Sequence, residues 1–169
     1  MADEQYADAI ALLKADHRTV EELFEKFSKA KDDESKRALA AQICTELKIH
    51  ATIEEEIFYP PFEGKIDENL YKEAYVEHDG AKVLINDIVA NCEEDEFFEA
   101  KVTVLCEEIT HHVEEEEKPG EGYFYQARQT DVDLVALRDA MLARKQELTA
   151  LAESEGLPAA QPTAVNVPA

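Results

Sequence analysis

Five histidines and two repeated His-x-x-x-Glu pairs are the residues of this 169-residue chain best suited to chemistry. The histidines are His17, His50, His78, His111 and His112, and the pairs are His50 with Glu54 and His112 with Glu116. Residues four apart on a helix are neighbours on one face, so the imidazole and carboxylate of each pair can reach a common centre. Since imidazole and carboxylate groups together ligate non-haem iron, manganese and zinc, the spacing predicts a metal site.

Four of the histidines continue apolar stripes. Around His50 the stripe runs through Ile43 and Leu47, includes Glu54 and resumes at Ile57, in steps of four and three residues. Burial of such polar side chains is costly unless they pair or bind something. Three further histidines lie on the apolar faces of other predicted helices, at similar distances from the connecting turns and so at about one height. The pattern predicts a cage in the middle of the bundle, made of His17, His50, Glu54, His78, His112 and Glu116.

The elements that must position these residues are helices. Apolar residues recur at helical spacing in residues 3–29, 35–59, 68–89 and 96–117, and again in residues 131–154. Short connections between four long helices predict an all-α fold, an antiparallel up-down-up-down four-helix bundle with an additional C-terminal helix. We assign residues 1–153 to this domain. Residues 154–169 are rich in proline and alanine and lack helical periodicity, so we expect them to form a disordered tail.

Composition restricts the partners and the compartment. A net charge of −22 repels phosphate, which argues against nucleic acid and anionic membranes as partners. The three cysteines form no Cys-x-x-Cys motif, which favours a reducing compartment. The N-terminus does not resemble a signal peptide, and no apolar run approaches the roughly 20 residues that span a bilayer. We therefore expect a soluble cytoplasmic protein, and a monomer.

The donor set indicates which metal would bind. Six side chains exceed the needs of one tetrahedral zinc ion, whereas calcium and magnesium prefer oxygen ligands. Glu54 and Glu116 can each span two ions, so the set suits a pair of non-haem iron ions, with manganese or zinc as possible substitutes. Two histidines for each metal leave coordination positions open. Open positions on reduced iron are what binding of dioxygen, peroxide or nitric oxide requires.

Four segments carry a resemblance to a known family. They are "LLKADHRTVEELF" at 12–24, "HATIEEEIFYP" at 50–60, "VEHDGAK" at 76–82 and "EITHHVEEEE" at 108–117. In this order and spacing the chain resembles bacterial hemerythrin-like proteins with the HHE cation-binding domain, over roughly residues 8–150. The resemblance implies a four-helix bundle with a non-haem di-iron centre. It also implies the ligands His17, His50, Glu54, His78, His112 and Glu116.

The third motif departs from the oxygen-carrying hemerythrins. Those proteins have His-x-x-x-His in the third helix, whereas here Lys82 follows His78 four residues later. One iron thus has an imidazole fewer, which argues against reversible oxygen storage. We expect Lys82 to extend into solvent. The alternative is that Lys82, Tyr71 or Tyr75 lies near the open position and donates a hydrogen bond to bound oxygen.

The fourth motif leaves a choice of residues. The segment "KPGEGYFYQAR" at 118–128 resembles an insertion relative to the family, and an insertion can shift the register of the preceding turn. His111 with Glu115 is therefore the alternative to His112 with Glu116, although the apolar stripe favours His112.

The predicted function follows from an open di-iron centre. We expect a protein that binds dioxygen or a related small oxidant, with a role in oxygen or redox sensing or in iron homeostasis, rather than an enzyme. One alternative is an enzyme that consumes peroxide or nitric oxide with electrons from a partner protein. Another is a metal-buffering protein whose site has no open position.

Overall fold

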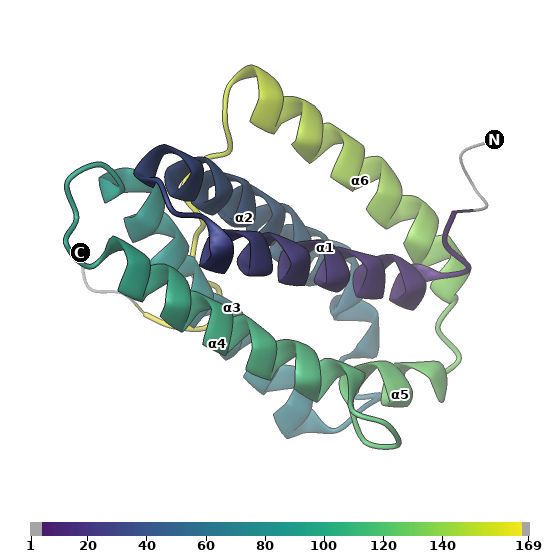
Figure 1. Ribbon diagram of the computed structural model, residues 1–169. Helices are drawn as coiled ribbons and strands as arrows, with labels where there is room; N and C mark the ends of the chain where they lie inside the picture. The colour runs from purple at the N-terminus through teal and green to yellow at the C-terminus, as the bar shows by residue number, and fades with distance from the viewer. Residues whose placement is uncertain (1–4, 167–169) are drawn as a thin grey trace.

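Four long helices, α1 to α4, form an antiparallel bundle, as the sequence predicted (Figure 1). The computed structural model describes residues 5–166. The α-helices are α1 (Ala9–Lys29), α2 (Asp33–Ile53), α3 (Glu68–Asn91), α4 (Phe98–Glu117), α5 (Tyr123–Arg128) and α6 (Leu134–Ser154). A π-helical turn (Glu54–Phe58) and a 3-10 turn (Pro60–Phe62) follow α2. The first predicted helix begins at residue 9 rather than residue 3, and residues 1–4 lie outside the described part of the chain.

Aspartate side chains begin four of these helices. Asp8, Asp32, Asp67 and Asp133 each accept a hydrogen bond from a backbone N–H in the first turn of α1, α2, α3 and α6. Such caps satisfy donors that have no partner within the helix. In α2, the backbone N–H that Asp32 caps is that of Ser35.

Two apolar layers make up the core, one on each side of the predicted histidine level. The layer at the N-terminal end of α1 includes Ile10, Leu13, Ile53, Phe58 and Tyr123. The layer at the opposite end of the bundle includes Phe24, Ile43, Leu47, Ile85 and Leu105. These side chains are buried and close-packed, which holds the four backbones at fixed distances. The layers therefore separate the level between them from solvent at both ends of the bundle.

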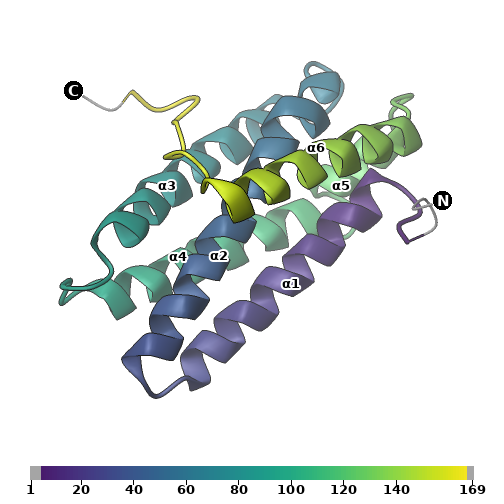
Figure 2. The same cartoon turned by 90° about the horizontal axis from the view of Figure 1, so that it is seen from above.

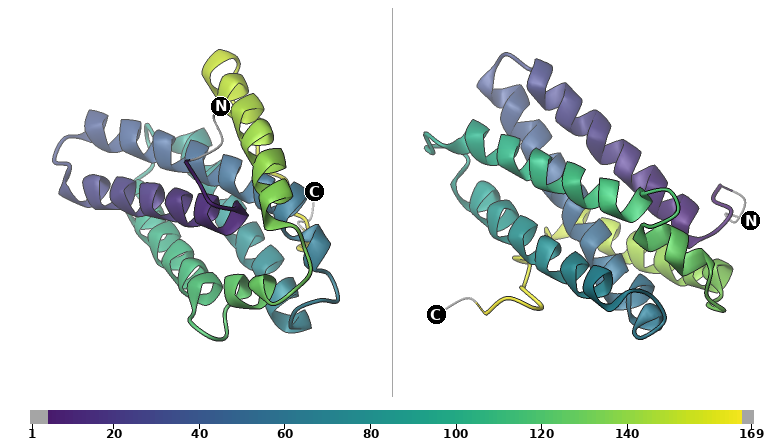
Figure 3. Two further views of the ribbon diagram at one scale, coloured as in Figure 1. Left: turned by 90° about the vertical axis from the view of Figure 1, so that its right-hand side faces the viewer. Right: turned by 90° about the horizontal axis from the view of Figure 1, so that it is seen from below.

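The additional C-terminal helix predicted from the sequence is α6. It lies over α1 and α2 on the outside of the bundle (Figures 2 and 3). Met141 and Leu148 are its buried residues. The short α5 lies beside the end of α4, within the segment that the sequence marked as an insertion. Along residues 5–166, no helix is both long and apolar enough to cross a membrane.

The C-terminal segment differs from the predicted disordered tail. Beyond α6 the described chain has no regular secondary structure and is held by hydrogen bonds to α2 and α3. The Asn86 side chain both donates to the Ala160 carbonyl and accepts from the Ala160 N–H, each at 2.8 Å. Lys48 donates to the Pro158 carbonyl at 3.1 Å. The physical reason is that backbone groups without a helical partner find polar side chains on the bundle; residues 167–169 lie outside the described residues.

Candidate metal centre

Four imidazoles meet in the middle of the bundle, one each from α1, α2, α3 and α4. The Nε2 atoms of His17 and His50 lie 3.2 Å apart, and we call these residues the first pair. The Nε2 atoms of His78 and His112, the second pair, also lie 3.2 Å apart. All four side chains are buried. The helices thus bring the four predicted histidines together with their Nε2 atoms pointing inward.

Glu54 and Glu116 each connect the two pairs. One carboxylate oxygen of Glu54 lies 3.2 Å from Nε2 of His50, and the other lies 3.1 Å from Nε2 of His78. Oε2 of Glu116 lies 3.3 Å from Nε2 of His17, in the first pair, and 3.6 Å from Nε2 of His112, in the second pair. Both carboxylates are buried, at 0% and 2% exposure. The six predicted residues therefore form one cluster, in which each carboxylate spans both pairs.

A further carboxylate faces the outer nitrogen of each histidine. The distances to Nδ1 are 2.7 Å from Glu117 to His17, 2.9 Å from Glu55 to His78, 2.6 Å from Glu77 to His112 and 3.5 Å from Asp16 to His50. A carboxylate at Nδ1 favours a proton there, which leaves the lone pair of Nε2 free for a cation. The sequence analysis missed these four acids. Each is the chain neighbour of a cluster residue, which is the signal that could have found them.

The π-helical turn places a tyrosine at the cluster. The N–H of Tyr59 donates to the carbonyl of Glu54 at 2.7 Å, five residues back, so both side chains face the centre. The Tyr59 hydroxyl donates to Glu116 at 2.8 Å. Burial and the two carboxylates raise the pKa of Tyr59 well above its usual value, so it stays a proton donor. Tyr71 and Tyr75, which the sequence analysis named in its alternative for Lys82, bring their hydroxyls within 3.3 Å of each other.

The cluster binds protons when it holds no metal. Burial lowers the pKa of His50, but Glu54 and Asp16 outweigh that effect and raise the pKa to about 10. In the same way Glu54 and Glu55 overcome burial and raise the pKa of His78 to about 9. Despite burial, His50 and His78 hold the pKa of the Glu54 carboxyl well below its usual value. The site therefore attracts positive charge, whether it arrives as protons or as metal cations.

The donor atoms fit cations. Oε1 of Glu54 and Oε2 of Glu116 are buried and have no hydrogen-bond partner within residues 5–166. Buried carboxylate oxygens are costly without a partner, and a cation between the histidine pairs would provide one. Two buried sets of residues can each bring their donor atoms within 4.8 Å of one another. One set is His17, His50, Glu54 and Glu116, and the other is Glu54, His78 and His112. Both sets contain Glu54, so the residues suit two neighbouring cations.

The family assignment agrees with this geometry. The family model described as the hemerythrin HHE cation binding domain matches residues 8–119. The chain belongs to the hemerythrin HHE family. The fold of this HHE protein is similar to the crystal structure of an HHE domain-containing protein from Mycobacterium kansasii, a homolog of Rv2633c. That likeness has a TM-score of 0.71 at 23% identity and covers 89% of this chain and 95% of the other.

A relative of different overall length is the protein named DNA nickase from Nostoc sp. (strain PCC 7120). It is 28% identical to this HHE protein over 116 residues, which are 69% of this chain but 33% of the relative. The chain therefore spans about a third of the length of that relative.

The structure of the HHE protein separates the two His-Glu pairs of α4. His112 is 4% exposed and lies in the cluster. His111 is 64% exposed, 3.5 Å from Glu77 and 3.6 Å from Glu115 on the surface. The alternative pair, His111 with Glu115, thus lies outside the buried centre. The last turn of α4 therefore keeps the register of the apolar stripe, with His112 and Glu116 buried.

The position of the Lys82 side chain differs from the one expected. The sequence analysis placed this side chain in solvent, but it is only 7% exposed. Its ammonium group lies 2.8 Å from Glu55 and 3.1 Å from Asp79. A buried lysine requires such partners, and two acids held by α3 and the π turn supply them. Lys82 therefore supports the carboxylate that contacts His78.

Proposed function

We propose that this HHE domain holds a non-haem di-iron centre that binds dioxygen or a related small oxidant, and that it serves oxygen or redox sensing or iron homeostasis. The observation that carries the proposal is the pair of buried donor sets that share Glu54. Mixed nitrogen and oxygen donors suit iron, and manganese or zinc can occupy such a site. Bound iron would supply an open coordination position and a change of oxidation state.

The residues of the chain support such a centre in three ways. Three of the outer carboxylates, Glu117, Glu55 and Glu77, fix the orientation of the imidazoles that they contact, which makes Nε2 of each a ready donor. The two apolar layers exclude bulk water from the level between them. The Tyr59 hydroxyl holds Glu116 by a hydrogen bond and keeps its own proton. Together they favour a small neutral ligand over hydrated ions.

The proposed role is sensing or homeostasis rather than oxygen transport. The position of the additional histidine in the oxygen carriers is taken by Lys82, whose ammonium group binds Glu55 and Asp79. The proposed ligand is dioxygen or a related small oxidant. Because the net charge is −22, a phosphate backbone would be repelled, and the nickase activity named for the Nostoc relative is not part of this proposal.

Iron content and the visible spectrum test the proposal. Protein produced with added iron should contain about two irons per chain, with near-ultraviolet bands that bleach on reduction and return in air. His50→Ala should lose the metal because it removes a donor from the first pair. His111→Ala is the matched control, a histidine on the surface of α4, and should keep both metal and spectrum. One zinc per chain with a flat spectrum, or equal metal loss in the two variants, would refute the proposal.

A further inference from the structure

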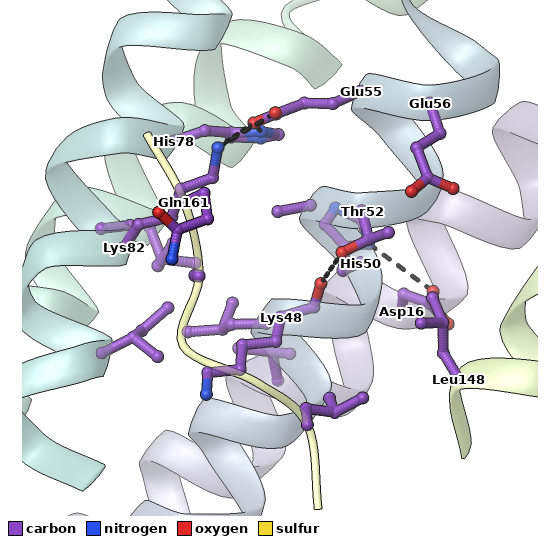
Figure 4. A pocket seen from close by; sticks show the side chains of 18 of the residues that line it. Asp16, Lys48, His50, Thr52, Glu55, Glu56, His78, Lys82, Leu148 and Gln161 are labelled. Atoms are coloured by element: carbon purple, nitrogen blue, oxygen red, sulfur yellow. Dashed lines mark hydrogen bonds and ion pairs between the residues drawn. The ribbon is translucent and has the colours of Figure 1, made fainter. Parts of the chain in front are cut away.

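A cavity of about 380 Å³ extends from the four histidines to the C-terminal segment. Figure 4 shows it between α2 and α3, with Leu148 of α6 on one side and the extended segment around Gln161 crossing it. Much of its wall is apolar, including Leu47, Ala81, Ile85, Leu148, Leu151 and Leu157. The cavity thus joins the bundle interior to a surface that the C-terminal segment covers.

The cavity meets the cluster on its histidine side. All four imidazoles line it, whereas Glu54, Glu116 and Tyr59 do not. The connecting carboxylates and the tyrosine hydroxyl therefore leave this approach to the centre free. A molecule in the cavity would lie next to the imidazoles.

The charged groups of the wall already have partners. Lys82 binds Glu55 and Asp79, while Arg144 binds Glu56 at 2.8 Å and Glu147 at 3.1 Å. Lys48 donates to the carbonyl of Pro158. A charged ligand would have to compete with these contacts and would lose its hydration against the apolar part of the wall. The wall therefore selects for a neutral, apolar molecule.

The volume sets the size of that molecule. An apolar cavity of about 150 Å³ accommodates benzene, and ligand pockets begin at about 300 Å³. At about 380 Å³, this cavity can take a molecule with two or more rings, or a short alkyl chain.

The outer wall is secured by hydrogen bonds to α3. The carboxylate of Asp79 accepts from the backbone N–H groups of Thr163, Ala164 and Val165, at 2.8, 2.6 and 2.7 Å. Together with the two bonds between Asn86 and Ala160, these contacts fix the segment across the cavity. The wall is thus a built part of the fold, and its side chains help to define the shape of the cavity.

We propose that this cavity is a binding site for a neutral, apolar organic molecule beside the metal centre, and that residues 157–161 form its outer wall. The proposal goes beyond the di-iron function and does not depend on which metal is bound. It requires only that the cavity and its wall persist in solution.

The neutral fluorescent probe N-phenyl-1-naphthylamine tests the site in full-length protein as isolated. Its fluorescence should rise and saturate at about one probe per chain. Ala160→Phe should weaken binding at least about tenfold, because the added ring fills the cavity while the backbone bonds to Asn86 remain. Ala164→Phe is the matched control, since Ala164 is exposed on the same segment and does not line the cavity, and it should bind like the wild type.

Further arms separate this proposal from the di-iron proposal. A chain ending at Gly156 lacks the wall and should also lose at least about tenfold in probe affinity, which keeps the test available if Ala160→Phe does not fold. Probe fluorescence should be lower in iron-loaded than in zinc-loaded protein, because iron beside the probe quenches it. Non-saturable binding by the wild type, or equal affinity in the two alanine variants and the shortened chain, would overturn the cavity proposal. Saturable binding by protein without iron would instead leave it standing while the di-iron proposal fails.

Discussion

Metal loading should release protons, and the number released follows from the cluster. With pKa values of about 10 and about 9, His50 and His78 are both protonated at pH 8 in the metal-free protein. A metal ion binds only the neutral imidazoles, so loading at pH 8 should release at least about two protons per chain. Had both histidines their ordinary pKa near 6.5, they would release together only roughly 0.1 proton.

The sign of the pH dependence can be derived in the same way. The pKa values of His50 and His78 are higher in the folded than in the unfolded chain, so protonation of these histidines stabilises the metal-free protein. This stabilisation is fully present below about pH 6.5 and is lost as the pH rises through about 9 and 10. Metal affinity changes in the opposite direction, because fewer protons must be displaced at higher pH. Metal loading should thus stabilise the fold most strongly at alkaline pH.

Calorimetric titration with manganese(II), in two buffers of different ionisation heat, measures the proton count. Manganese is suitable because water bound to it stays neutral at pH 8, so the protons come from the protein. His111→Ala serves as the control and should release as many protons as the wild type, since this histidine lies outside the cluster. Release of less than half a proton at pH 8, or a count that does not fall between pH 8 and pH 10, would refute the reasoning.

Three further predictions concern stability and the C-terminal segment. Tyr59→Phe leaves the buried Glu116 without its 2.8 Å donor and should lower the free energy of unfolding of the metal-free protein by about 1–3 kcal/mol, measured in urea. Leu105→Ala should lower the free energy of unfolding by about 2–5 kcal/mol in the same assay, because Leu105 is fully buried. The control is Val104→Ala, at the exposed neighbouring residue, which should change this free energy by no more than about 0.5 kcal/mol. Asn86→Ala removes the two hydrogen bonds between this side chain and Ala160 and should speed amide exchange around Ala160, measured by mass spectrometry, while exchange in α6 is unchanged.

The fold could be predicted from the sequence because helical periodicity and helix ends are local. Apolar stripes identified the four bundle helices and α6. The six cluster residues were found for the same reason, since a polar residue inside an apolar stripe is visible without a structure. His112 rather than His111 followed from the stripe alone, and the burial of the two residues agrees.

Contacts between helices could not be predicted in the same way. With 39 Asp and Glu residues in the chain, an acid beside a histidine is common, and only the rotation of each helix decides which acid faces which ring. Glu77, for example, is adjacent to His78 in the chain but contacts His112. The burial of Lys82 has the same origin, because its partner Glu55 is brought to it by the π turn of another helix.

The segment read as an insertion closes one end of the cluster. After α2 the π turn itself supplies Tyr59, whereas after α4 a loop and α5 bring Phe124 against His17, with ring centres 5.7 Å apart and planes at 12°. This approach needs a glycine at the start of α5, since a Cβ on Gly122 would lie 2.5 Å from the Glu115 carbonyl oxygen. The two His-x-x-x-Glu motifs are thus followed by different structures, and both structures contribute aromatic rings to the same side of the cluster. There the ring centres of Tyr59 and Tyr123 lie 4.9 Å apart. The sequence motif is therefore repeated, whereas the segments that cover the cluster after each copy of the motif differ in structure.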